Sequence, residues 1–202
     1  EMCIRDSNYT GGNVLNQTIS QDKLTESFPG LTKLFASFRI APTGNALKAE
    51  IPNGANNNRI ELQDLNIATQ LSAGNDQYYG SNGNDGIFLS KGRDLIQAGD
   101  GSDLIAALSD ISSAKATISF DDSTNDASSN TLYLSKESLA IGKSKIVIND
   151  FATKKDVIAL DTKKSAVSGY NTNKLQISTR KKSVITIKSK DDVFKKRDVE
   201  FL

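Results

Sequence analysis

Four aspartates in the middle of the chain recur at a constant interval of nine residues. They are Asp76, Asp85, Asp94 and Asp103, and each follows a glycine by two positions. Glycine adopts turn conformations that other residues avoid, so each Gly-x-Asp step predicts a turn that presents a carboxylate. A fixed short interval of this kind indicates a repeat architecture.

The chemistry that these carboxylates could perform is the binding of a hard cation. If two nine-residue units form one coil of a stacked structure, turns eighteen residues apart face each other. Asp76 then opposes Asp94, and Asp85 opposes Asp103. Facing carboxylates repel one another unless a cation lies between them, and oxygen-only ligands of flexible geometry favour Ca²⁺ over zinc or copper.

The composition excludes most catalytic chemistry. The 202 residues include no His and a single Cys. This removes histidine-built zinc sites and catalytic triads, as well as disulfides and thiolate clusters. We therefore expect no enzyme in this chain, although a catalytic domain could lie upstream in a longer protein. We also expect no membrane span, because no apolar run is long enough for one.

Each nine-residue unit has two physical halves. Its first six residues are rich in Gly, Asn, Ser and Asp, which is typical of turns, and its last three predict a short strand with an inward-pointing middle residue. The middle residues are all large and apolar, namely Tyr78, Ile87, Ile96 and Ile105. The repeat therefore predicts an all-β fold, a parallel β-roll in which two units make one coil.

The units at 80–88 and 98–106 resemble the calcium-binding nonapeptide of the hemolysin-type, or RTX, proteins. The resemblance covers residues 71–106 and implies a β-roll that folds on Ca²⁺ outside the cell, after export by the type I secretion machinery. The residues that it implies at the calcium sites are Asp76, Asp85, Asp94, Asp103, Asn82, Asp100, Gly74, Gly80, Gly83, Gly92, Gly99 and Gly101.

The first and third units depart from the family pattern, since they begin with Leu-Ser where the family has paired glycines. These units supply Asp76 and Asp94, which share one flank of the predicted roll. We expect the other flank, with Asp85 and Asp103, to bind Ca²⁺ more tightly, because Asp100 adds a nearby carboxylate there. The alternative is a calcium-free stack whose aspartates only cap turns.

The chain divides into four predicted parts. Residues 1–7 look like a translated sequencing adapter and are expected to be non-native, leaving the C-terminal part of a longer protein. Residues 8–60 form an N-terminal segment of unknown role, in which apolar residues at helical spacing predict a short helix over 31–39. The β-roll is assigned to 61–110, and a C-terminal β-strand cap with a type I secretion signal to 111–202.

Alternating apolar residues over 146–148 and 158–160 predict half-buried strands. With the neighbouring Asp150, Phe151 and Asp156 they resemble the segment that follows the roll in many RTX proteins. We expect these strands to close the open end of the roll. The two aspartates are then structural rather than calcium ligands.

Further strands are predicted where Leu175 alternates with Ile177, and Val184 with Thr186. The acidic segment 121–126 lacks the glycine and the closing glutamate of an EF-hand, so we expect a solvated loop there.

Charge is distributed unevenly along the chain. Residues 1–140 carry 10 Lys and Arg against 17 Asp and Glu, whereas residues 141–202 carry 15 against 7. Basic runs at 180–182 and 195–197 could contact an acidic polysaccharide or a cell surface. A solvated basic face explains them equally well, and the lack of interleaved aromatics argues against nucleic acid.

The leading hypothesis is a calcium-binding RTX-type module that drives folding of a secreted or surface-attached bacterial protein after export. The chain closes with acidic and then apolar residues over 198–202, which resembles the end of many type I secretion substrates. Two alternatives remain open at this point. One is the accessory module of an exported protease, lipase or alginate epimerase, and the other is a polysaccharide-binding module.

Overall fold

The computed structural model describes residues 15–19, 47–51, 59–61, 68–71, 73–80, 84–120, 128–139, 143–178, 184–190 and 192–202. The sequence-predicted features outside these ranges are residues 1–7, the helix over 31–39, the loop over 121–126, the basic run at 180–182, Asn82 and Gly83. The described chain is built from β-strands and two short 3₁₀ helices, Lys164–Ala166 and Lys196–Asp198.

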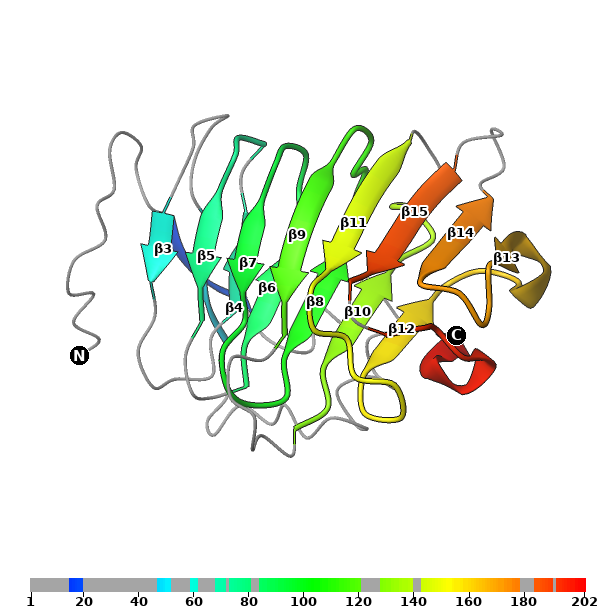
Figure 1. Ribbon diagram of the computed structural model, residues 1–202. Helices are drawn as coiled ribbons and strands as arrows, with labels where there is room; N and C mark the ends of the chain where they lie inside the picture. Colours follow the sequence, from blue (N-terminus) through cyan, green and yellow to red (C-terminus); the bar gives the residue numbers. More distant parts are fainter. Residues whose placement is uncertain are drawn as a thin grey trace.

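The strands form two eight-stranded sheets (Figure 1). Sheet A contains, in spatial order, β1 (Leu15–Ile19), β2 (Leu47–Ile51), β4 (Ala68–Gln70), β6 (Gly86–Phe88), β8 (Leu104–Ala107), β10 (Thr131–Leu134), β12 (Val157–Leu160) and β16 (Val199–Phe201). Sheet B contains β13 (Val167–Ser168), β14 (Lys174–Ser178), β15 (Val184–Ser189), β11 (Ser144–Ile148), β9 (Lys115–Ser119), β7 (Leu95–Gln97), β5 (Gln77–Tyr79) and β3 (Arg59–Glu61). The predicted all-β class is confirmed.

Successive strands from β2 to β12 alternate between the two sheets, and each strand from β2 to β10 pairs in parallel with the strand two places along the chain (Figure 1). Between β5 and β8 the paired residues are separated by two nine-residue units, as in Gln77 with Leu95 and Gly86 with Leu104. The same spacing pairs β3 with β5 and β4 with β6. The regular register therefore begins before the first Gly-x-Asp step.

The short strands of the repeat lie where the pattern predicts them. The last three residues of the first three units are β5, β6 and β7, and β8 extends one residue beyond the fourth unit. Their middle residues have 0% of their surface exposed: Tyr78, Ile87, Ile96 and Ile105. All four belong to one apolar cluster that runs from Leu71 to Val199. Burial of each such side chain contributes about 1.5–3 kcal/mol.

Beyond the repeat the register lengthens but the parallel pairing continues. Leu95 pairs with Thr117, and Leu104 pairs with Thr131. The expectation that β11 and β12 close the end of the structure is wrong, because each has a parallel neighbour on both sides. The far end consists of the antiparallel strands β13, β14 and β15 in sheet B and of β16 in sheet A.

The predicted strands at the C-terminal end are confirmed as β14 and β15. The phase of β15 differs from the prediction, since Val184 and Thr186 are only partly buried whereas Ile185 and Ile187 are fully buried. Ile185 and Ile187 pair with Ser144 and with a core isoleucine of β11, so they continue the inward row of sheet B. Val184 and Thr186 consequently lie on its outer face.

Candidate cation site in the stacked turns

The four repeated aspartates occupy the residue directly before a strand of the repeat. Asp76, Asp85, Asp94 and Asp103 have exposed fractions of 1%, 0%, 3% and 1%. The turns that carry them need glycine, as at Gly92 with φ of 129°. Aspartate is rarely this buried unless it is paired or hydrogen-bonded, so each of these side chains requires a partner.

The structure brings together both pairs that the eighteen-residue spacing predicts. The backbone N–H of Asp76 donates to Oδ1 of Asp94 at 3.1 Å. In the same way the N–H of Asp85 donates to Oδ1 of Asp103 at 2.7 Å. One carboxylate oxygen of the later aspartate therefore caps the turn that precedes the paired strand.

Two asparagines add a parallel set of bonds that the sequence reasoning missed. The N–H of Arg93 donates to Oδ1 of Asn75 at 2.9 Å, and the N–H of Ser102 donates to Oδ1 of Asn84 at 2.7 Å. Both bonds also span eighteen residues. The available signal was the asparagine directly before the aspartate in the first two units.

The row of caps on sheet A continues past the repeat. The N–H of Asp103 donates to Oδ1 of Asn130 at 2.8 Å, and the N–H of Asn130 donates to Oδ1 of Asp156 at 3.0 Å. These bonds span 27 and 26 residues, so a search at a fixed interval does not reveal them. A neutral amide fills the same place in this row as an aspartate. Capping alone therefore does not require a charge at the four repeated positions.

Asp94 is the aspartate whose electrostatic situation is most demanding. Its pKa is raised from 3.8 to about 7, mainly by burial; the hydrogen bond from the Asp76 backbone opposes the shift, and the nearby charge of Asp76 adds to it. Oδ2 of Asp94 is buried and has no hydrogen-bond partner. An unpaired buried carboxylate oxygen is costly, so this atom favours either a proton or a cation beside it.

Two glycines allow a main-chain carbonyl to approach the backbone closely. A Cβ at Gly92 would lie 1.7 Å from the carbonyl oxygen of Gly74, and a Cβ at Gly80 would lie 1.8 Å from that of Ala98. The Gly80 position also lies beside a carboxylate, since the same Cβ would be 2.8 Å from Oδ2 of Asp85. A carbonyl and a carboxylate oxygen therefore both lie close to Gly80, whereas the oxygens close to Gly92 are main-chain carbonyls.

The remaining predicted site residues are placed less centrally. The carbonyl of Gly92 accepts a hydrogen bond from the N–H of Lys115 at 2.8 Å, so it already has a protein partner. Gly99 and Gly101 adopt positive φ values of 93° and 113° around Asp100, which is partly exposed. These residues therefore set the backbone conformation of the turn before β8.

The donor set fits a hard divalent cation. Within the described ranges no three Asp, Glu, His or Cys side chains cluster closely enough to form a metal site by themselves. Ca²⁺ commonly completes its shell of oxygens with backbone carbonyls and water. A pair of stacked carboxylates, with one buried oxygen of Asp94 lacking a hydrogen-bond partner, is compatible with that preference.

Asp150 and Asp156 have the structural contacts expected of them. Oδ1 of Asp150 accepts the N–H of Phe120 at 2.8 Å. Oδ2 of Asp156 accepts the N–H of Ala152 at 2.7 Å, while its other oxygen caps Asn130. Both carboxylates therefore fix the backbone of turns.

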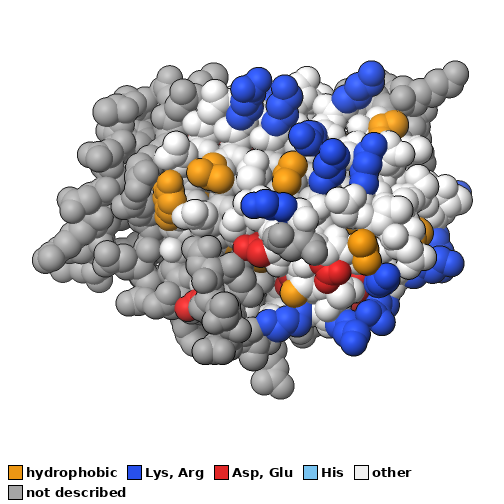
Figure 2. Space-filling model, viewed as in Figure 1, with side chains coloured by type: hydrophobic (Ala, Val, Ile, Leu, Met, Phe, Trp, Pro, Cys, Tyr) orange, Lys and Arg blue, Asp and Glu red, His pale blue; other side chains and the backbone are white. Residues whose placement is uncertain are grey.

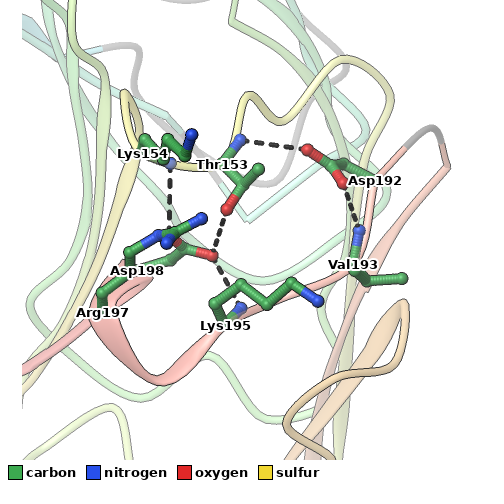
Figure 3. A network of polar contacts seen from close by, with 7 residues as sticks. All are labelled: Thr153, Lys154, Asp192, Val193, Lys195, Arg197 and Asp198. Carbon is green, nitrogen blue, oxygen red and sulfur yellow. Dashed lines mark hydrogen bonds and ion pairs between the residues drawn. The ribbon is translucent and has the colours of Figure 1, made fainter.

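Asp198 plays a similar part directly before β16 (Figure 3). Its carboxylate accepts hydrogen bonds from Oγ1 of Thr153 at 2.8 Å, from the N–H of Lys154 at 3.2 Å and from the N–H of Lys195 at 2.6 Å. Nε of Arg197 lies 3.7 Å from the same group. This network ties the turn before β12 to the turn before β16.

No helix in the described part of the chain has both the length and the apolar character needed to cross a membrane. No protein-family model, no curated protein and no solved structure matches the chain.

Proposed function

We propose that the chain is a calcium-binding β-roll of the RTX type, in which Ca²⁺ bound between stacked turns completes folding. The observation that carries the proposal is the stacking of buried aspartates in successive turns, with Oδ2 of Asp94 lacking a partner. The alternation of strands between two parallel sheets at an eighteen-residue spacing supports a roll.

In this proposal Asp76 with Asp94, and Asp85 with Asp103, supply the side-chain oxygens on the two flanks. Backbone carbonyls of the glycine-rich turns supply further oxygens, and Asp100 contributes nearby negative charge. Bound Ca²⁺ offsets the repulsion and desolvation of buried carboxylates that otherwise oppose folding. With their aspartates charged, the stacked turns are therefore stable in the folded state only when the cation is bound.

The proposal assigns the module to the outside of a bacterial cell, where calcium is plentiful. Extracellular calcium modules bind at about 10⁻⁴–10⁻³ M. At tenfold excess each site contributes about 1.4 kcal/mol, so two sites contribute about 3 kcal/mol. In the cytosol this contribution is absent, which keeps the chain loosely folded for export by type I secretion.

Thermal unfolding of the full chain, followed by circular dichroism in chelator, Ca²⁺ or Mg²⁺, tests the proposal. Ca²⁺ should raise Tm by roughly 6–12 °C, and Mg²⁺ should have little effect. Asp94→Asn keeps the cap but removes the charge, so it should raise the calcium-free Tm while reducing the calcium-induced increase by about half.

Asp161→Asn is the matched control, because Asp161 is partly exposed and lies after β12, away from the repeat turns. It should leave the calcium-induced increase unchanged. An unchanged Tm on addition of Ca²⁺ to the parent chain would contradict the proposal. So would an equal increase in the parent chain and in Asp94→Asn.

A further inference from the structure

The outer face of sheet B is open to solvent, unlike that of β8 and β10 in sheet A. In β9, β11 and β14 buried residues alternate with partly or fully exposed ones. In β8 and β10 of sheet A every residue is buried. Figure 2 shows Lys and Arg side chains gathered over the face on which β9, β11 and β15 lie.

Six exposed lysines lie on this surface or at its margin, and we call them the lysine face: Lys115, Lys143, Lys145, Lys174, Lys188 and Lys190. Lys145 is the direct register partner of Lys115, and Lys188 is that of Lys174. Neighbouring strands lie about 4.8 Å apart, so these like charges oppose each other at close range. Such pairs destabilise a sheet.

Two ordinary explanations of surface lysines do not account for this arrangement. Lysine often protects the edges of sheets, but β9, β11 and β15 are interior strands of sheet B. Nearby acids could compensate the charge, but no described outward residue of these strands is acidic. The ion pairs found in the described ranges involve Lys91 and Arg197, neither of which belongs to the lysine face.

We propose that the lysine face binds an acidic polysaccharide. Its uncompensated positive charge complements the regularly spaced anionic groups of such a chain. Between the lysines lie neutral hydrogen-bonding side chains that suit sugar hydroxyls, among them Thr117, Thr186 and Gln176. The described outward residues from β7 to β14 include no aromatic on which a nucleic-acid base could stack.

Binding of the full chain to hyaluronan, measured by calorimetry at fixed calcium and low salt, tests this proposal. The double variant Lys115→Gln/Lys145→Gln should lower the affinity about 20-fold, because each lysine near an anionic surface raises the affinity about four- to fivefold. Neutral dextran should not bind, and added salt should weaken binding to hyaluronan. Circular dichroism of the variant checks that the exposed substitutions leave the fold intact.

Lys163→Gln/Lys164→Gln is the matched control, since it removes the same charge from exposed residues around the first 3₁₀ helix. This control should lose less than about twofold in affinity. Equal losses in the two double variants would overturn the lysine face as a specific surface. Absence of binding to hyaluronan, or tighter binding of a single-stranded oligonucleotide, would overturn the proposal that the ligand is an acidic polysaccharide. None of these results depends on whether Ca²⁺ binds in the repeat turns.

Discussion

Charge and hydrogen bonding make separate demands on the buried aspartates of the turns. The row on sheet A runs from Asp85 through Asp103 and Asn130 to Asp156, and each member caps the one before it. Asn130 meets the hydrogen-bonding demand with no charge. Aspartate at all four repeated positions therefore retains a cost that capping does not explain, and this cost is what a bound cation would offset.

The two flanks of the repeat differ in their local charge. Lys91 and Arg93 lie in the turn that leads to Asp94, whereas Asp100 lies in the turn that leads to Asp103. Asp85→Ala should therefore raise the Kd for calcium about tenfold or more, because the ligand charge of a calcium site tunes its affinity.

Asp76→Ala should raise the same Kd only about threefold, since its flank already carries cationic side chains that disfavour Ca²⁺. Calcium titration of the two variants by calorimetry measures both effects. Equal losses of affinity, or a larger loss for Asp76→Ala, would contradict this ordering of the flanks.

Asp156 predicts a pH dependence that is independent of calcium. Burial raises its pKa from 3.8 to about 6. The folded state therefore holds this proton more tightly than the unfolded chain. The stabilisation is complete below about pH 4 and is lost as the pH rises through about 6, which costs on the order of 2 kcal/mol. Urea unfolding in chelator at pH 4.5 and pH 7 should show the loss.

Asp156→Asn should reduce the difference between the two pH values, because the substituted side chain does not titrate, and Asp94, whose pKa is raised to about 7, should account for the remainder. It also gives up the acceptor for the N–H of Ala152, so its absolute stability is a poor readout. The informative quantity is the difference in unfolding free energy between the two pH values. A variant that keeps the slope of the parent chain would show that other groups cause it.

At the scale of turns and strands, the repeat predicts what local chemistry controls. The glycine and apolar positions predict the strands β5 to β8 and their inward residues, and the interval predicts which aspartates meet. The cap from Asn130 could not be predicted, because the loop before β10 interrupts the nine-residue interval. The inward face of β15 could not be predicted either, because Val184 and Ile185 are both apolar and only packing against β11 decides which of them points inward.

The turn before β7 is where backbone conformation most limits substitution. Gly92 combines a φ of 129° with a main-chain carbonyl that a Cβ would meet at 1.7 Å. Gly92→Ala should therefore lower the free energy of unfolding by about 3 kcal/mol, as measured by urea denaturation in chelator.

The adjacent Lys91→Ala serves as the control for this turn. Lys91 is exposed and forms an ion pair with Asp110 at 2.8 Å, an interaction worth less than about 1 kcal/mol at the surface. If Gly92→Ala were as mild as Lys91→Ala, the close approach of the two glycine turns would not constrain the fold.

Across the whole molecule, the two sheets share one core rather than separate repeat and cap cores. The apolar cluster includes Ile96 from the repeat and Ile187 from β15, and parallel pairing links β8 to β10 and β9 to β11 without interruption. Elements that share a core tend to unfold together. A change in the stability of the repeat turns should therefore also change the stability of the strands at the far end of the sheets.

Hydrogen exchange of the full chain with and without Ca²⁺ measures how far this coupling extends. If calcium stabilises a single cooperative unit, the slowest amides of β11 and β15 should gain as much protection as those of β7, about 100-fold for about 3 kcal/mol. Binding that is felt only locally would instead slow exchange over 73–106 and leave β15 unchanged. Because the apolar cluster runs unbroken from Leu71 to Val199, we expect the global response. Calcium bound at a few turns would then control the folding of strands that contain none of its ligands.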